Sequence, residues 1–449
     1  MKVAKFGGSS LASAAQIQQV ANIIKADLER RIIVVSAPGK RHADDTKVTD
    51  LLIAAAEARF ANKSGRAELD LVIARYADIG AGLDLPATDL DPIVADLEER
   101  LACDPRDEAG FIDTMKAGGE DNCARLSAQY LRAQGVEAHY VNPRDGGLTL
   151  SDEPGNARVL ESSYGQLRAL RQRPGVTVFP GFFGYSASGR VVTFSRGGSD
   201  ITGSILAAAV DADLYENFTD VDSVFVANPT LVKNPVSVAE MTYREMRELA
   251  YAGFSVFHDE ALEAVFHAGI PVAIKNTNNP QAPGTRITLA RETKDVPVVG
   301  IAATGGFCSV YISKYLMNRE VGFGRRLLQL FEDEAIPYEH TPTGIDNISV
   351  IVRQEHFSAA TEERVLRHIR TELAVDEISV ERNLALVMVV GEGMDHTIGL
   401  AAHATAAFAQ ARVNIEMINQ GSSEVSMMFG IKEEDVPATV GALYEEFYG

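Results

Sequence analysis

Residues 2–28 read KVAKFGGSSLASAAQIQQVANIIKADL, and this stretch decides the class of fold. Residues 2–6 are a short apolar run, Gly7 and Gly8 interrupt it, and apolar residues then recur at helical spacing through residues 11–28. A buried strand that ends in a glycine pair and leads directly into a helix is typical of the opening of a β-α-β unit. The stretch therefore predicts an α/β domain.

The same alternation continues to residue 297. Strand-like runs rich in β-branched residues alternate with stretches of helical apolar spacing, and residues 62–115 are expected to form a mostly helical, charged accessory segment. Strands that alternate with helices indicate a mainly parallel sheet sandwiched by helices. The expected strands are 2–6, 31–36, 136–141, 176–179, 190–194 and 285–290, and the expected helices are 11–28, 53–59, 122–133, 199–210, 243–252 and 259–268.

After residue 297 the pattern changes to two copies of a β-α-β-β-α unit, which are spaced about 70–75 residues apart. A stretch dense in turn-forming residues, 276–284, precedes the change. We therefore expect an α/β domain over residues 1–297 and a repeated domain over 298–449, with its two copies at about 298–380 and 381–449.

The composition narrows the class of protein. The chain has 449 residues, with 42 lysines and arginines against 62 aspartates and glutamates, and a formal net charge of −20. More than half of this net charge lies after residue 297. We expect no nucleic-acid partner, because nucleic-acid binding requires a basic surface. No membrane association is expected either, because no apolar run approaches the roughly 20 residues that span a bilayer.

The cysteines and the missing motifs narrow the class of protein further. Cys103, Cys123 and Cys308 form neither a pairable framework nor a Cys-x-x-Cys motif, and the first residues lack the apolar core of a signal peptide. A reducing, cytoplasmic compartment is the expectation. The common phosphate-loop, dinucleotide and nucleophile-elbow motifs are absent from the sequence.

Four polar segments instead lie where strands end and helices begin. Residues 5–10, Lys-Phe-Gly-Gly-Ser-Ser, would present backbone amides at a helix start, which suits a polyphosphate, although a plain chain reversal uses the same residues. Residues 195–200, Ser-Arg-Gly-Gly-Ser-Asp, place an arginine fork beside a glycine pair. The alternative is that Ser199 or Asp200 is only a helix cap.

The other two segments are 34–52 and 118–122. In the first, Ser36 ends a strand and Thr49 lies at a helix start, a pattern that fits a substrate cradle and equally fits an ordinary capped turn. In the second, Gly-Gly-Glu-Asp-Asn is expected to open a helix, with Glu120 either a binding carboxylate or a favourable first-turn residue.

Taken together and in order, these segments resemble the aspartate kinases of the amino-acid kinase superfamily. The family's lysine-glycine motif appears at 5–10, and its Ser-Arg-Gly-Gly-Ser-Asp motif is intact at 195–200. Residues 218–222, Phe-Thr-Asp-Val-Asp, resemble its nucleotide strand and loop. The repeated C-terminal part resembles the family's pair of ACT domains, including Gln-Gly-Ser-Ser-Glu at 420–424.

The resemblance implies an amino-acid kinase fold and an enzyme that transfers the γ-phosphoryl group of ATP to the β-carboxylate of L-aspartate, the first step of lysine, threonine and methionine biosynthesis. That carboxylate is ionised at neutral pH, with an ordinary pKa of about 3.9, so no general base is needed. The implied catalytic residues are Lys5, which would contact the phosphates, and Asp200, which would hold the lysine. The implied substrate-binding residues are Ser36, Thr49, Glu120, Arg196 and Ser199, with Glu120 on the α-ammonium group and Arg196 on a carboxylate.

The resemblance also implies ATP as the co-substrate together with Mg²⁺, which would arrive with the nucleotide and need few protein ligands. Two departures affect the nucleotide contacts, because Thr230 and Ser255 stand where the family commonly has an arginine and a lysine. Lys275 either supplies one replacement charge or is a solvated strand end. The implied nucleotide-binding residues are Gly7, Gly8, Ser9, Thr219, Asp220, Phe225 and Lys275, with Ser9 in place of the usual threonine and Phe225 in place of a frequent tyrosine.

ACT domains commonly pair side by side and bind amino acids at the interface, so the resemblance implies a homodimer or higher homo-oligomer regulated by lysine, threonine or both. Such an effector needs donors for its carboxylate and a carboxylate for its ammonium group. Helix-start amides at 320–323 and Asp346 would supply them, unless both are turn chemistry only. The implied effector-site residues are Met317, Glu320, Val321, Gly322, Asp346 and Asn347.

Three alternative functions remain. The first is a kinase for a related substrate, such as glutamate or N-acetylglutamate, and the intact motif at 195–200 together with Glu120 argues against it. The second is a catalytically weak amino-acid sensor, suggested by the two missing cations, and the presence of both Lys5 and Asp200 argues against it. The third, one part of a fused kinase and homoserine dehydrogenase, is limited by the length of the chain and by the missing dinucleotide motif.

Overall fold

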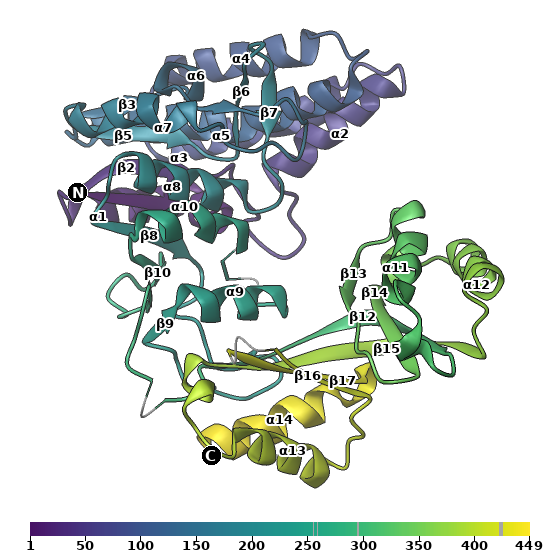
Figure 1. Cartoon of the computed structure of the whole chain (residues 1–449). Helices are drawn as coiled ribbons and strands as arrows, with labels where there is room; N and C mark the ends of the chain where they lie inside the picture. Colours follow the sequence, from purple (N-terminus) through teal and green to yellow (C-terminus); the bar gives the residue numbers. More distant parts are fainter. Residues whose placement is uncertain (255, 258, 294–295, 422–424) are drawn as a thin grey trace. The chain divides into compact units, whose positions relative to one another are not determined.

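The computed structural model describes residues 1–254, 256–257, 259–293, 296–421 and 425–449. The chain forms two compact units (Figure 1). The first unit comprises Met1–Val224, Ser237–Ala250 and Ser255–Arg291, and the second comprises Phe225–Val236, Tyr251–Phe254 and Glu292–Gly449. The second unit therefore includes two short segments that lie, in sequence, within the first.

The first unit is built on an eight-stranded sheet with the order β3-β5-β2-β1-β8-β10-β11-β9. Neighbouring strands are parallel except for β10 and β11, so the predicted mainly parallel sheet is confirmed. The strands are β1 (Lys2–Phe6), β2 (Arg30–Val35), β3 (Ala138–Tyr140), β5 (Val176–Pro180), β8 (Leu214–Thr219), β9 (Glu240–Thr242), β10 (Val272–Asn276) and β11 (Thr285–Thr288). A small three-stranded sheet adds β4 (Thr149–Leu150), β6 (Phe183–Ser186) and β7 (Val191–Thr193).

Helices separate most of these strands, as the alternation predicts. The α-helices up to residue 291 are α1 (Ala14–Lys25), α2 (Val48–Phe60), α3 (Arg66–Gly82), α4 (Asp91–Ala102), α5 (Glu108–Ala133), α6 (Pro143–Gly146), α7 (Ser162–Leu167), α8 (Gly198–Ala209), α9 (Tyr243–Tyr251) and α10 (Glu263–Ala268). Short 3₁₀ helices are η1 (Gly8–Leu11), η2 (Ala87–Leu90), η3 (Arg168–Gln172) and η4 (Asp259–Leu262).

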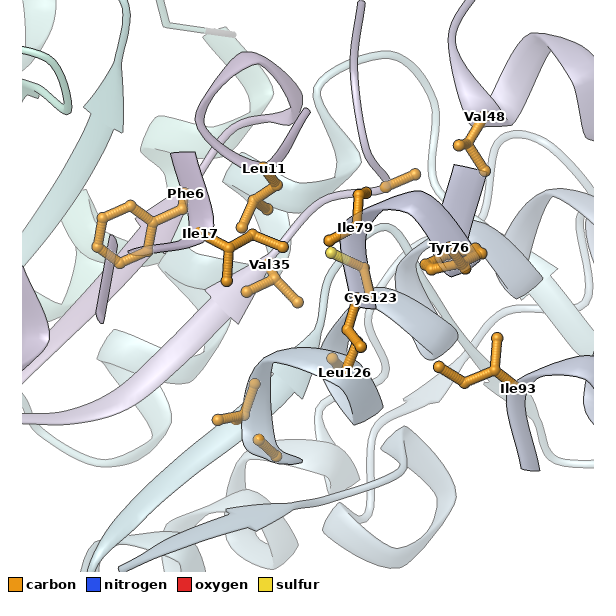
Figure 2. Packing of buried hydrophobic residues seen from close by; sticks show 14 of the residues in the cluster. Phe6, Leu11, Ile17, Val35, Val48, Tyr76, Ile79, Ile93, Cys123 and Leu126 are labelled. Atoms are coloured by element: carbon orange, nitrogen blue, oxygen red, sulfur yellow. The ribbon is translucent and has the colours of Figure 1, made fainter. Parts of the chain in front are cut away.

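Alternation along β1 decides which layer each side chain reaches. Ala4 and Phe6 enter a core shared with α1 to α5, and Phe6 stacks on Phe218 of β8 with ring centroids 4.7 Å apart. Figure 2 shows this core, with Phe6 and Val35 on the strands and Cys123 on α5. Because successive side chains of a strand point to opposite faces, Lys5 lies on the other face, where α8 packs against β1. The central strand therefore builds the core with one face and delivers a lysine to α8 with the other.

Helix α5 corrects one prediction. The expected helix start at 118–122 was wrong, because α5 begins at Glu108 and carries Gly118 and Gly119 in its interior. A Cβ atom on Gly119 would lie 2.8 Å from the Cβ atom of Ala37, the second residue after β2. Glycine is needed here because α5 approaches the end of β2 too closely for a side chain.

The second unit contains a six-stranded antiparallel sheet with the order β13-β14-β12-β15-β17-β16. Its sequence of elements repeats β-α-β-β-α twice, which confirms the predicted pair of units. The strands are β12 (Gly300–Ser313), β13 (Tyr338–His340), β14 (Asn347–Arg353), β15 (Glu377–Val390), β16 (Met417–Gln420) and β17 (Ser426–Lys432). The helices are η5 (Met317–Arg319), α11 (Phe323–Asp333), η6 (Gln354–His356), α12 (Ala359–Leu373), η7 (Glu392–Asp395), α13 (Leu400–Ala411), η8 (Glu433–Asp435) and α14 (Val436–Tyr448).

Two hydrophobic cores share the two long strands of this sheet. The residues that precede and begin β12, Val298 and Ile301, pack with α13 and α14, whereas its later residues, such as Val310, pack with α11 and α12. Strand β15 divides in the same way. Ala227 joins the first of these cores, and the amide of Ile301 donates to the carbonyl of Val226 at 2.6 Å. The segment 225–236 is thus part of the second unit's packing.

The close approach of α5 to β2 predicts a cost for Gly119→Ala. The added methyl group overlaps Ala37, and overpacking of this kind destabilises by about 1–3 kcal/mol. Urea unfolding should show this loss. Gly165→Ala is the matched control, because Gly165 lies in α7 with no neighbouring atom within 4 Å of the place that the new methyl group would take, and alanine is the better helix former. Equal stability of the two variants would contradict the packing argument.

Candidate functional site

Buried Lys5 and half-buried Asp200 form an ion pair at the end of β1. The ammonium group of Lys5 lies 2.5 Å from Oδ1 of Asp200, which is in the first turn of α8. Asn217 of the neighbouring strand β8, in register with Lys5, donates its Nδ2 to the same oxygen at 2.7 Å. The lysine is 8% exposed and Asn217 is 1% exposed. Strand β1, strand β8 and helix α8 therefore each contribute one side chain to this group, and Oδ1 of Asp200 holds the three side chains together.

The glycine turn that follows β1 lies directly beside this pair. A Cβ atom on Gly7 would lie 3.5 Å from the Lys5 ammonium nitrogen, so the glycine keeps the turn open to that charge. The amide of Gly7 donates to the carbonyl of Phe218, and the carbonyl of Gly8 accepts from the amide of Gly39 at 2.8 Å. The turn is held between β8 and the loop after β2.

A cavity of 580 Å³ opens at this turn and gathers many of the predicted residues. It is bounded by the glycine turn, the end of β2, the start of α2, the middle of α5 and the loop after β8. Of the predicted site residues, the structure brings together here Gly8, Ser9, Ser36, Thr49, Glu120 and Asp220.

Glu120 is the buried carboxylate of this cavity. It is 5% exposed, it accepts a hydrogen bond from the amide of Ala37, and its Oε2 finds no hydrogen-bond partner among the described residues. Burial raises the pKa of Glu120 to about 8, and the Ala37 amide and the Lys116 ammonium group oppose that rise only in part. A buried acceptor without a partner is suited to a ligand that brings a positive charge.

Other predicted residues do not line this cavity. Arg196 is exposed in the turn before α8 and forms no ion pair with a described carboxylate, and Ser199 is buried in the first turn of α8, where a Cβ atom on Gly181 would lie 2.5 Å from its Oγ. Thr219 ends β8 and donates to Asp220 at 3.2 Å, and half-buried Lys275 lies on β10 in register with Phe218.

The remaining nucleotide predictions fall elsewhere. Phe225 belongs to the second compact unit, as does Thr230, whose amide donates to the side chain of Asn228 at 2.9 Å. Ser255 lies outside the described residues.

The predicted effector residues surround the loop before α11 in the second unit. Met317 is buried, Val321 is 93% exposed, and Gly322 adopts a φ of +79° at the start of α11. Glu320 pairs with Lys314 at 2.6 Å and with Arg326, and hydrogen bonding from Lys314 lowers the pKa of Glu320. This carboxylate is already engaged in the loop.

Asp346 and Asn347 close the same loop from the other side. Oδ1 of Asp346 accepts from the amide of Leu316 at 2.9 Å, and its carbonyl accepts from the amide of Lys314 at 2.8 Å. Asn347 begins β14. The structure therefore brings 314–322 and 345–347 together. Of the predicted motif at 420–424, residues 422–424 lie outside the described residues.

Asn217 and the basic loop at 40–47 were missed by the sequence reasoning. Strand β8, which carries Asn217, was not among the expected strands, and the available signal for Asn217 was a polar residue inside the run Leu-Tyr-Glu-Asn-Phe-Thr at 214–219. The loop residues Lys40, Arg41, His42 and Lys47 line the cavity, and their signal was a cluster of basic residues between Ser36 and Thr49 in an acidic chain.

Comparison with known families agrees with this architecture. The profile of the amino acid kinase family matches residues 1–276, and a profile of the ACT domain matches residues 387–447. The first unit, with its cavity at the carboxyl ends of the parallel strands, is therefore an amino acid kinase domain. ACT-type structure follows it in the chain.

Individual relatives narrow the class. The chain is 57% identical to Aspartokinase 3 of Bacillus subtilis (strain 168) over 448 residues, which cover 100% of this chain and 99% of the relative. The crystal structure of Clostridium acetobutylicum aspartate kinase, 35% identical, superposes with a TM-score of 0.88 over 100% of both chains. The chain belongs to the aspartokinases of the amino acid kinase family.

A more distant solved structure shares the fold. Escherichia coli aspartokinase III, solved with aspartate and ADP in an R-state, is 23% identical and gives a TM-score of 0.80 over 100% of both chains.

Among the described residues, no helix has both the length and the apolar character required to cross a bilayer.

The raised pKa of Glu120 predicts a pH-dependent stability. Between its ordinary pKa of 4.5 and its folded value of about 8, the folded protein holds a proton that the unfolded chain has lost. The free energy of unfolding should therefore fall as the pH rises through this window, by on the order of a few kcal/mol. Urea unfolding at pH 5 and pH 8 measures this fall, which Glu120→Gln should abolish. A variant with the same pH dependence as the parent protein would contradict the assignment.

Proposed function

We propose that this protein transfers the γ-phosphoryl group of ATP to the β-carboxylate of L-aspartate and yields 4-phospho-L-aspartate and ADP, in the cytoplasm, as the first step of lysine, threonine and methionine biosynthesis. The observation that carries the proposal is the ion pair of buried Lys5 and half-buried Asp200 beside a glycine turn. That turn lines a cavity that also holds the buried carboxylate of Glu120, whose Oε2 has no hydrogen-bond partner among the described residues. Membership of the aspartokinases supports the same reaction.

The chemistry requires charge stabilisation more than proton transfer. A β-carboxylate oxygen attacks the γ-phosphorus, a new P–O bond forms, and the bond to the oxygen that bridges the β- and γ-phosphates breaks, with its electron pair leaving on ADP. The nucleophile is already ionised, so no base is needed. The barrier comes from bringing two anions together, and Lys5 stabilises the charge on the transferring group while Asp200 and Asn217 fix the lysine.

The amino-acid substrate would be held by groups of both signs. Glu120 would receive the α-ammonium group at its unpartnered oxygen and lose its proton on binding, because a cation favours the ionised carboxylate. Arg196 would hold a carboxylate with its two-pronged guanidinium group. Ser36, Thr49 and Ser199 would add hydrogen bonds, and the first two line the same cavity as Glu120.

The nucleotide would place its phosphates at the glycine turn. Gly7, Gly8 and Ser9 leave room for phosphate oxygens next to the Lys5 ammonium group. Thr219, Asp220 and Lys275 complete the proposed nucleotide contacts within the first unit, and the nucleotide role of Phe225 of the second unit stays a prediction. Mg²⁺ would be bound mainly by phosphate oxygens and water, and Asp220, which lines the cavity beside the turn, is the carboxylate suited to it. When bound, the metal would neutralise part of the phosphate charge.

Regulation and assembly complete the proposal. A homodimer or higher homo-oligomer would form through the ACT-type unit, and lysine, threonine or both would inhibit the enzyme. The effector would bind near the loop 314–322 and Asp346, where helix-start amides and a carboxylate lie together. The exposed apolar side chains of Val321 and Ile345 in these loops support an interface there.

Lys5→Met tests the catalytic assignment. The variant keeps the aliphatic stem and removes the ammonium group, so kcat for aspartate-dependent ADP formation should fall at least about 100-fold. A coupled assay of ADP formation measures the fall in kcat with aspartate. The same assay with glutamate and N-acetylglutamate shows which substrate the enzyme uses. Lys25→Met, an exposed lysine of α1, is the control. Turnover of Lys5→Met at the parent rate, or no turnover of aspartate by the parent protein, would refute the proposal.

Asp346→Ala tests the effector site. With its carboxylate removed, the concentration of lysine or threonine that halves the enzyme's own uninhibited rate should rise at least about tenfold. Asp333→Ala, at the exposed end of α11, is the matched control. Unaltered inhibition in Asp346→Ala would place the effector elsewhere.

A further inference from the structure

The loop between β2 and α2 contributes four basic side chains to the active-site cavity. Lys40, Arg41, His42 and Lys47 all line it, together with Gly8 and Ser9 of the glycine turn. None of the four has a role in the reaction proposed for the cavity. The question is which of them keeps its charge available for a ligand.

Arg41 is neutralised within the loop. Its guanidinium group pairs with Asp45 at 2.9 Å and lies 3.7 Å from Asp78, and buried Arg75 pairs with Asp45 at 2.7 Å. Hydrogen bonding from Arg41, supported by the charge of Arg75, holds the pKa of Asp45 well below its usual range. These charges therefore hold the loop in shape and are not available to a ligand.

Lys40 and Lys47 are not neutralised in this way. The ammonium group of Lys40 donates to the carbonyl of Ala43 at 3.3 Å, and neither lysine forms an ion pair with a described carboxylate. Both side chains are exposed and both line the cavity. Two unneutralised positive charges thus face the space beside the glycine turn.

The backbone that carries these lysines is fixed to the turn. The amide of Gly39 donates to the carbonyl of Gly8, and a Cβ atom on Gly39 would lie only 2.6 Å from the carbonyl carbon of Gly8. Arg75 donates to the carbonyl of Gly39 at 3.0 Å. Lys40, the next residue, therefore starts from a backbone position locked against the turn.

The position of Lys47 is fixed as well. It is the N-cap residue of α2, and the amide of the following residue, Val48, donates to the carbonyl of Pro38 at 3.2 Å. Both ends of the loop are thus tied to the strand end that borders the cavity. Neither lysine depends on a loose loop for its approach to a ligand.

We propose that Lys40 and Lys47 are further catalytic residues that contact the phosphoryl oxygens of ATP at the glycine turn. The assignment rests on the proposed function, which places the triphosphate there. Phosphoryl transfer to a carboxylate gathers several negative charges in one cavity, and two unneutralised ammonium groups on a fixed backbone attract and orient the nucleotide. Lys40 then acts from the loop and Lys5 from the sheet.

Kinetics of Lys40→Met, Lys47→Met and the double variant test the proposal. Each single change should lower kcat/KM for ATP about 10- to 100-fold while KM for aspartate stays within about twofold. Lys40→Arg should recover part of the loss, because it restores the charge. Lys63→Met, an exposed lysine after α2 and outside the cavity, should match the parent enzyme.

Binding of a non-hydrolysable ATP analogue, measured by calorimetry, separates this proposal from the proposed function. A parent protein that turns over no aspartate refutes the function, yet weaker analogue binding by the lysine variants would still support the phosphate contacts. Unchanged analogue binding and unchanged kcat/KM for ATP would overturn the proposal. So would a rise confined to KM for aspartate, which would assign the lysines to the amino-acid carboxylate.

Discussion

The rest of the active site depends on the ion pair between Lys5 and Asp200. Removing two charges from water costs several kcal/mol per ion, and a contact of 2.5 Å reinforced by the Asn217 amide offsets that cost only while all three groups stay in place. The pair therefore fixes β1, β8 and α8 relative to one another at the carboxyl end of the parallel strands. That end of an open α/β sheet is where ligands bind. The Lys5–Asp200 pair is costly to bury, and it lies at the end of the sheet where the lysine ammonium group can bind an anionic ligand.

Glu120 is the residue that we propose selects the amino-acid substrate at the same cavity. Gly119 of α5 allows this helix to approach the end of β2. The neighbouring carboxylate of Glu120 is buried there, and one of its oxygens has no partner among the described residues. A buried acceptor of this kind discriminates strongly, because a ligand without an ammonium group leaves it unpaired. The raised pKa of Glu120 reflects the same cost of burying a charged carboxylate. The packing of Gly119 against Ala37 thus supports the substrate selectivity that we propose for Glu120.

The class of fold, the order of its elements and many of the residues around the cavity could be predicted because strand alternation, helical spacing and glycine turns are local signals. The interior position of Gly119 in α5 could not be predicted, since the close approach of Ala37, a residue distant in sequence, explains it. Local patterns also could not show that residues 298–303 pack with α13 and α14, because a strand's periodicity does not state which core it enters. The sequence also could not show that Lys40 and Lys47 keep their charges available, for a related reason. Which basic residues are neutralised depends on where Asp45 folds back.

The central claim is that a carboxylate oxygen of aspartate attacks the γ-phosphorus in the cavity beside Lys5. Phosphorus NMR of the reaction between ATP and aspartate labelled with ¹⁸O in its β-carboxylate tests this most directly. The account predicts ADP together with an acyl phosphate whose phosphorus signal shows the isotope shift of one bridging ¹⁸O atom. Formation of ADP with unlabelled inorganic phosphate alone, or an acyl phosphate without the label, would contradict it.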